Sequence, residues 1–281
     1  MNETQLILLH ALTPLHVGTG QAVGNVDLPI AREKATGFPI VPASALKGVL
    51  RDYFSGESWA TQAFGDTDQA GAWVFTDLRI LCLPVRSFFG VFAYATCPLI
   101  LQRLQRHAEA FGTTGFENLS VNLKEMVEVQ EMDVALAKQS ILAHATVGNQ
   151  KKVYLEDLDL TVKELQGADD VAQKIADKLL PEGERSHFTA RFAVVSNDVF
   201  TFLSETATEV VARVRLADDT KTVASGGLWY EEAVPAEAVF YGFVGATSAE
   251  PSLVSLQIDQ PLQIGGDATI GRGLCKVVIA P

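Results

Sequence analysis

Hydrophobic residues recur along this chain in short runs and alternations, a pattern that predicts many strands. Residues 4–12 (TQLILLHAL) form an apolar run of the length expected for a buried strand. Residues 151–163 (KKVYLEDLDLTVK) alternate between apolar and charged positions, as a half-buried strand does. By the same criteria, further strands are expected at 73–84, 188–195, 198–203, 238–246, about 252–264 and 274–279.

Three segments have the spacing of helices. In the clearest, Ser44 is a possible N-cap and apolar residues follow at helical spacing from Leu46 to Tyr53. Two further helices are expected at 98–111 and 169–180. Because helices and strands interleave irregularly, we expect an α+β fold with a mostly antiparallel sheet.

Residues 209–224 (EVVARVRLADDTKTVA) predict a β-hairpin. Apolar residues from Val210 to Leu216 alternate with Arg213 and Arg215, so the two kinds of side chain face opposite ways. The Asp-Asp-Thr sequence at 218–220 would form the turn. Few large core residues lie near that turn, so we expect the hairpin to project from the body of the protein.

The chain has 281 residues, of which 48% are hydrophobic and 20% charged, which is enough to build a sizeable core. No long linker divides it, so we expect one domain spanning residues 1–281, with insertions. The formal net charge of -12 argues against a nucleic-acid-binding protein. Because salt limits the reach of each charge to roughly 10 Å, an acidic protein can still carry one basic groove.

Three dispersed cysteines, Cys82, Cys97 and Cys275, indicate no disulfide framework. The N-terminus lacks the basic start of a secretory signal, and the apolar run that follows is too short to cross a bilayer. We therefore expect a reducing, cytoplasmic setting and no membrane partner.

Three stretches carry a resemblance to a known family. They are HVGTGQAVGNVDLPIAREKATGFPIVPASALKGVLR (16–51), GGLWYEEAVP (226–235) and LQIGGDATIGRGLCKV (262–277). In sequence and order they resemble the backbone subunits of the type III-B CRISPR (Cmr) effector complex, which belong to the RAMP superfamily. The matches span about a quarter of the chain, and their positions at both ends make the resemblance effectively full-length.

This resemblance implies a ferredoxin-like (RRM-like) core with insertions, one of them a thumb hairpin at about 205–228. Copies of the chain would stack along a CRISPR guide RNA beside other Cmr-complex subunits. Each thumb would kink the duplex of guide and complementary target RNA, and the target would be cut at regular intervals by a metal-dependent endoribonuclease site.

The resemblance also assigns the key acid of that site to Asp27, the residue before Leu-Pro. A carboxylate can hold Mg²⁺ or Mn²⁺, which prefer oxygen ligands, although an Asp in such a loop is otherwise typical of a turn or a helix cap. The expected nucleophile is a 2′-hydroxyl of the target. His16 is a candidate general base or phosphate contact, or a structural histidine. Glu231, with Glu232 beside it, is a candidate catalytic acid or a solvated surface residue.

Guide-RNA contact is the expected role of Ser44, Lys47 and Arg51, whose spacing also suits a solvated helix face. Further RNA contacts are expected from a set of residues elsewhere: Arg32, Arg215, Lys221, Gly271 and Arg272. The glycine-rich loop 265–273 has neither the order of a P-loop nor a GxGxxG that opens a helix, so nucleotide cofactors are excluded.

Two other functions stay open. The chain could be an RNA-binding scaffold of the same complex without cutting activity. In the sequence, only Asp27 distinguishes a catalytic subunit from such a scaffold. A guide-processing endonuclease of the same superfamily would instead act as a single subunit with a histidine-centred site, and the LWYEE stretch at 228–232 argues against it.

Overall fold

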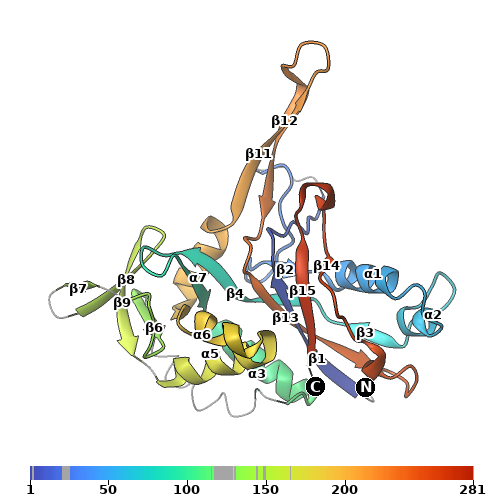
Figure 1. The fold of residues 1–281 in the computed structure, drawn as a ribbon, viewed down its shortest axis with the longest axis horizontal. Helices are drawn as coiled ribbons and strands as arrows, with labels where there is room; N and C mark the ends of the chain where they lie inside the picture. Colours follow the sequence, from blue (N-terminus) through green and yellow to red (C-terminus); the bar gives the residue numbers. More distant parts are fainter. Residues whose placement is uncertain are drawn as a thin grey trace.

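A large mixed sheet forms the centre of the protein in the computed structural model (Figure 1). The structure describes residues 1, 3–20, 26–114, 116, 129, 131–143, 145–147, 150–164 and 166–280. In sheet order the strands are β14 (Leu262–Gln263), β15 (Leu274–Ala280), β1 (Glu3–Ala11), β13 (Val239–Ala246), β4 (Leu78–Arg86), β5 (Phe92–Thr96), β10 (Phe192–Val195), β6 (Asp133–Leu136), β9 (Leu158–Glu164), β8 (Gln150–Leu155) and β7 (Ala145–Val147).

Most neighbouring strands are antiparallel, and only the pairs β5–β10 and β6–β9 are parallel among the described strands. Two short strands complete the sheet, β2 (Ile40–Val41) beside β4 and β3 (Trp73–Phe75) beside β13. The predicted α+β class with a mostly antiparallel sheet is therefore confirmed.

Continuous apolar strands occupy the middle of the sheet. All eight residues of β13 are buried, as are the last six of β1, from Leu6 to Ala11. Both faces of these strands are covered, which explains why they read as unbroken hydrophobic runs rather than as alternations. The strand expected at residues 4–12 is thus confirmed, and it lies at the core.

The helices are α1 (Ala43–Tyr53), α2 (Ala60–Phe64), α3 (Pro98–Phe111), α5 (Gln166–Leu179), α6 (Glu182–Thr189) and α7 (Asn197–Thr206), with two short 3-10 turns at Leu253–Ser255 and Ala268–Ile270. The bounds of α3 follow from its sequence, because Pro98 suits the first helical position and Gly112, at φ 66°, ends the helix in the left-handed conformation. Figure 1 shows α3, α5 and α6 grouped on one side of the molecule and α1 and α2 on the other. Among the described residues, no helix combines the length and apolar character that crossing a bilayer requires.

Several predictions of local structure are wrong, and residues 188–189, expected in a strand, lie in α6. Residues 198–203 are helical in α7, because the Ser196 hydroxyl caps that helix by accepting from the Val199 N–H at 3.2 Å. Most of 252–264 is not a strand, since only residues 262–263 pair with β15. Ser44 does not cap α1; that helix begins at Ala43, whose N–H donates to Asp77 Oδ1 at 2.8 Å.

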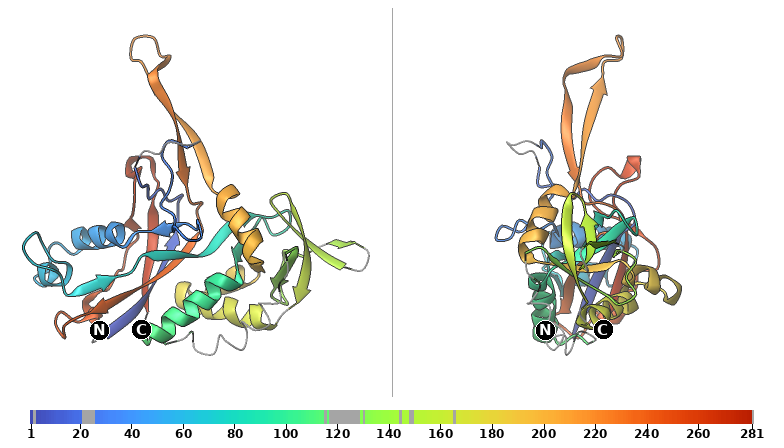
Figure 2. Two further views of the ribbon diagram at one scale, coloured as in Figure 1. Left: turned by 180° about the vertical axis from the view of Figure 1, so that it is seen from behind. Right: turned by 90° about the vertical axis from the view of Figure 1, so that its left-hand side faces the viewer.

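A two-stranded hairpin of β11 (Glu209–Leu216) and β12 (Val223–Ala233) stands away from the sheet (Figures 1 and 2). Its pairing extends nine residues beyond the predicted end at 224. The register shifts between Val214 and Leu216, opposite Gly227. A Cβ at Gly227 would lie 2.8 Å from the carbonyl oxygens of Ala224 and Arg215, so this close approach requires glycine.

Candidate active site

Two N-terminal segments, residues 15–18 and 26–32, run along the base of β12. Leu15 and Val234 exchange two backbone hydrogen bonds of 2.8 and 2.9 Å. Leu28 donates to the Tyr230 carbonyl at 3.1 Å and accepts from the Glu232 N–H at 3.0 Å. The base of the hairpin is therefore held by segments that lie about 200 residues away in sequence.

Asp27 is exposed at this base, and the hairpin holds it in place. Its Oδ2 accepts a hydrogen bond of 2.7 Å from the backbone N–H of Tyr230. Within the described part of the chain, Oδ1 accepts no hydrogen bond. Asp27 thus presents one carboxylate oxygen to solvent from a position that β12 fixes.

His16 lies on the same edge of β12. Its Nδ1 is 2.6 Å from the Glu232 carbonyl oxygen, and because a carbonyl only accepts, Nδ1 carries a proton. The Tyr230 N–H and the Glu232 C=O point to one side of the strand, two residues apart, which corresponds to about 7 Å along it. Asp27 and His16 are therefore bonded to the same edge of β12.

Glycines shape the space around His16. A Cβ at Gly18 would lie 2.7 Å from His16 Nε2, so a larger residue there would displace the imidazole ring. Gly265, at φ 82°, would bring a Cβ within 2.1 Å of the His16 carbonyl oxygen, and the neighbouring Gly266 N–H donates to that oxygen at 2.9 Å. The glycine-rich C-terminal loop thus packs against the backbone of His16.

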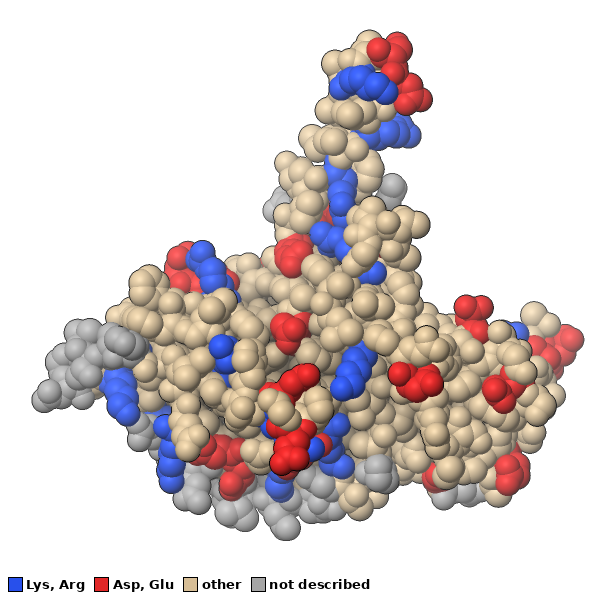
Figure 3. All heavy atoms as spheres, viewed as in Figure 1, with Lys and Arg blue, Asp and Glu red and all other residues tan. Residues whose placement is uncertain are grey.

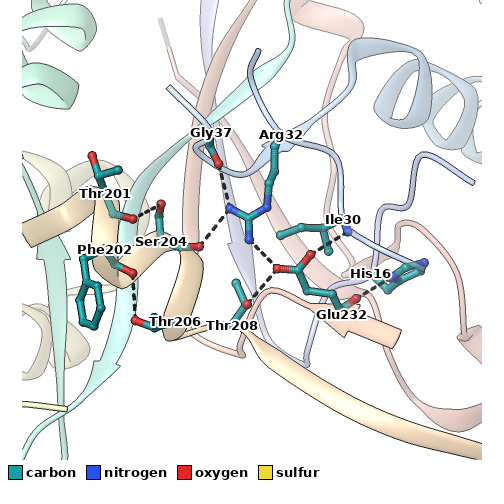
Figure 4. Close-up of polar contacts among 10 residues, drawn as sticks. All are labelled: His16, Ile30, Arg32, Gly37, Thr201, Phe202, Ser204, Thr206, Thr208 and Glu232. Atoms are coloured by element: carbon teal, nitrogen blue, oxygen red, sulfur yellow. Dashed lines mark hydrogen bonds and ion pairs between the residues drawn. The ribbon is translucent and has the colours of Figure 1, made fainter. Parts of the chain in front are cut away.

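Glu232 is the buried hub of the site (Figure 4). Its Oε1 accepts from Arg32 Nη2 at 2.5 Å and from the Thr208 hydroxyl at 2.9 Å, while Oε2 accepts from the Ile30 N–H at 3.1 Å. Arg32 Nη1 also donates to the carbonyls of Gly37 (2.8 Å) and Ser204 (3.0 Å). The guanidinium of Arg32 is thus turned into the protein, and this geometry does not support its predicted phosphate contact.

Glu231 is also buried and points to a second cluster. Arg213 Nη2 lies 3.3 Å from its Oε1 and 3.2 Å from Asp267 Oδ2. Burial and the hydrogen bond with Asp267 raise the pKa of Glu231, and that hydrogen bond, with Arg213, lowers the pKa of Asp267. Glu231 is thus engaged with Arg213 inside the protein, and this geometry supports a structural role for Glu231 rather than the predicted catalytic one.

The C-terminal loop residues predicted to bind phosphate are engaged within the protein. The side chain of Arg272 is only 11% exposed, and its Nη1 lies 3.7 Å from Glu231 Oε1. The Gly271 N–H donates to the Ala268 carbonyl at 3.1 Å. The structure therefore gives Arg272 and Gly271 roles in holding the loop and the hairpin base.

The other predicted RNA contacts lie on the surface. Arg215 and Lys221 are exposed on the hairpin, where Figure 3 shows basic side chains along its length and acidic ones at its tip. On α1, Ser44 and Arg51 are exposed. Lys47 is half-buried, its Nζ donates to the Trp73 carbonyl at 3.3 Å, and burial together with Arg51 lowers its pKa. Their contact with RNA stays a prediction.

The structure supplies no complete cage for a divalent ion. Within the described ranges, no group of three or more His, Cys, Asp or Glu side chains could hold one. Asp27 offers a single free oxygen. Since Mg²⁺ is commonly held by one or two carboxylates together with substrate phosphates and water, Asp27 fits only as the protein's share of such a site.

Several residues of this site were not expected from sequence. The Tyr230 N–H, Thr208 and Asp267 have no signal in a single sequence, since their roles arise from contacts between distant segments. Glu232 had one weak signal: two adjacent acids on a strand face opposite ways, so one of them points inward wherever one face of the strand is covered.

Removing Arg32 is predicted to destabilise the protein strongly. The variant Arg32→Ala would leave the Glu232 carboxylate buried without its cation, at a cost of about 3–5 kcal/mol in the free energy of unfolding. The matched control, Arg215→Ala, removes an exposed arginine and should change that free energy by no more than about 0.5 kcal/mol. Chemical denaturation measures both. Equal stability of the two variants would contradict the role assigned to Arg32, whereas adding Glu232→Gln to Arg32→Ala should recover part of the loss.

Comparison with known proteins places this geometry in a family. The RAMP superfamily model matches residues 8–276. The chain is 36% identical to the CRISPR system Cmr endoribonuclease Cmr4 of Pyrococcus furiosus, covering 99% of this chain and 96% of that protein. The crystal structure of oligomeric Cmr4 from Pyrococcus furiosus superposes with a TM-score of 0.74 at 29% identity, over 100% of this chain and 98% of that one. A chain of the type III-B Cmr-beta complex bound to cognate target RNA shares the fold, with a TM-score of 0.78 at 21% identity, over 99% and 97% of the two chains. This chain therefore belongs to the RAMP superfamily and, within it, to the Cmr4 family.

Proposed function

We propose that this chain is the repeating backbone subunit of a type III-B CRISPR effector complex. In this role it binds guide RNA, stacks with further copies of itself and with other Cmr subunits, and cuts complementary target RNA. The observation that carries the proposal is the position of Asp27, which is exposed on the strand edge that also binds His16 and is fixed by the Tyr230 N–H at the base of a projecting hairpin. The three buried free cysteines suit a reducing cytoplasm.

The hairpin is the proposed thumb. One of its faces carries exposed apolar side chains, among them Val214 and Leu228, which are 53% exposed and lie opposite each other. An apolar wedge of this kind can unstack neighbouring base pairs, as apolar side chains do in proteins that kink nucleic acids. Arg215 and Lys221 on the same hairpin would meet the phosphates. A nucleotide displaced by the wedge would bring its ribose to Asp27 at the base.

The core that supports the hairpin is proposed to be ferredoxin-like. Four antiparallel strands lie in the order β15-β1-β13-β4, which is the 4-1-3-2 order of such a core when numbered along the chain. In this arrangement α1 follows the first strand, and Ser44, Lys47 and Arg51 on it would contact the guide backbone.

The proposed reaction is transesterification within the target RNA. The 2′-hydroxyl attacks the adjacent phosphorus, its proton passes to Asp27, and the bond to the 5′-oxygen breaks. His16, protonated at both ring nitrogens in this step, donates the Nε2 proton to that oxygen and becomes neutral, so that the products are a 2′,3′-cyclic phosphate and a 5′-hydroxyl. Because the free oxygen of Asp27 accepts this proton, Asp27 would hold a divalent ion only through water, and the ion would stabilise charge on the phosphate.

Substituting Asp27 tests the enzyme against the scaffold. In the complex assembled on guide RNA, Asp27→Asn should slow target cutting by at least about 10²-fold, the range of one acid–base group, with guide binding unchanged. Asp219→Asn, in the exposed hairpin turn, is the matched control and should cut at the wild-type rate. Wild-type cutting by Asp27→Asn would favour the scaffold without catalysis.

Two changes to the reaction test its chemistry with the protein unaltered. A target with a single 2′-deoxy nucleotide at the scissile position should resist cutting there and be cut at its other sites, because only that nucleophile is missing. Chelating divalent ions should stop cutting, and Mg²⁺ or Mn²⁺ should restore it. Normal cutting at the deoxy position would exclude the 2′-hydroxyl as nucleophile, and full activity in chelator would exclude the ion.

A further inference from the structure

The turn between β4 and β5, residues 87–91, holds two large apolar side chains out in solvent. Phe88 is 79% exposed and Val91 is 75% exposed, the two highest values among the large hydrophobic residues described. We call Phe88 and Val91 the apolar knob. Because burying such side chains is favourable, their exposure in the isolated chain indicates a surface that is covered in an assembly.

The backbone of this turn is strained and firmly anchored. Val91 has φ 76°, a left-handed conformation that is a genuine outlier for a β-branched residue. The Ser87 N–H donates to the Val91 carbonyl at 2.9 Å, and Arg191 Nε donates to the Gly90 carbonyl at 3.0 Å. The Phe88 N–H donates to the Tyr154 carbonyl of β8 at 3.1 Å. The knob is therefore a preformed, rigid feature rather than a loose loop, and strain held in this way is typical of functional surfaces.

A groove of about 470 Å³ lies at the opposite end of the sheet. Its walls are mostly apolar and come from β15 and the segment 256–261: Leu256, Ile258, Val277, Val278 and Ile279 are among its lining residues. On this side β14 pairs only with Leu274 and Cys275, so within the described chain the rest of β15 is an open sheet edge. Open edges are sites at which another chain can attach.

We propose that the apolar knob of one copy of this chain binds in the β15 groove of the next copy. The proposal rests on the stacking described under the proposed function and names the surfaces that stack. The knob lies against β8 and the groove against β15, near the two ends of the strand order (Figure 1). A contact between two different surfaces of one molecule does not close on itself and generates an open stack.

The charges around the two surfaces fit a protein partner better than RNA. Beside the knob, Arg86 pairs with Glu156 at 3.3 Å and Arg191 donates to the Gly90 and His187 carbonyls, so neither arginine is left unpaired. The groove is lined by one acid, Asp259, and one base, Lys276. Neither surface repels the other, and neither offers the excess of positive charge that phosphates require.

Variants on each surface allow a complementation test. The knob variant is Phe88→Ser with Val91→Gly, in which glycine tolerates the positive φ and so preserves the turn. The groove variant is Ile258→Asp. The matched control is Phe202→Ser, which removes an exposed aromatic side chain from α7. Mass photometry on a guide RNA long enough for two copies measures the cooperativity with which two copies of the chain bind. Binding to a guide fragment long enough for one copy measures the intrinsic affinity of the chain for RNA.

Each variant alone should lose at least about tenfold in cooperativity, the effect of removing one interface anchor, and should bind the one-copy fragment like the wild type. A 1:1 mixture should load pairs cooperatively again, because the groove variant still has its knob and the knob variant still has its groove. Wild-type cooperativity in either variant, or a mixture that fails to recover, would overturn the proposal. Weakened binding to the one-copy fragment by the knob variant would show that the knob contacts RNA instead.

Sedimentation velocity of the same samples without RNA separates this inference from the proposed function. Suppose that the wild-type chain binds no guide but associates with itself, that each variant abolishes this association, and that their mixture forms dimers again. That result would contradict the proposed function and support the inference. A wild-type chain that fails to associate with itself both on guide RNA and without it would overturn the inference.

Discussion

A single buried ion pair, between Glu232 and Arg32, joins three elements at the candidate site: the N-terminal segment, α7 and the base of the hairpin. The carboxylate of Glu232 has almost no access to water and must be compensated by the protein, since an isolated buried charge is very unfavourable. Arg32 and the Ile30 N–H supply that compensation from the N-terminal segment, and Thr208 supplies it from the chain just before β11. Arg32 in turn binds the carbonyl of Ser204 at the end of α7. The ion pair therefore fixes where the N-terminal segment, the helix and the hairpin meet.

This constraint gives the hairpin a firm base and its active residues a fixed position. A two-stranded hairpin is only marginally stable alone, and here its outer half is loosened by the register shift near Gly227. The lower half gains partners on both sides: β11 on one edge of β12, and residues 15 and 27–28 on the other. Asp27 and His16 are bonded to β12 itself. A movement of the hairpin on binding RNA would therefore move the residues that would meet the displaced ribose.

The sequence predicted those parts of the fold that local patterns encode. The apolar runs of β1 and β13 and the Pro98 and Gly112 boundaries of α3 are local signals, and the alternation in β11 revealed the hairpin. Pairing between distant segments has no local signal, so the Asp27–Tyr230 bond, which spans 203 residues, was not foreseen. Charged residues read as surface residues, which is why the burial of Arg32, Glu231 and Arg272 was missed. Asp27 itself stood out only through the family resemblance.

The central claim is that Asp27, held at the base of the hairpin, meets the ribose-phosphate link that is cut. The most direct test is a cryo-electron microscopy structure of this chain assembled on guide RNA with a target made uncleavable by 2′-deoxy substitution. The account predicts a target nucleotide unstacked by the hairpin, with its sugar-phosphate either within about 3 Å of the Asp27 carboxylate or joined to it by one bridging ion or water. A fully stacked duplex with Asp27 beyond the reach of one such bridge from every target phosphodiester would contradict it.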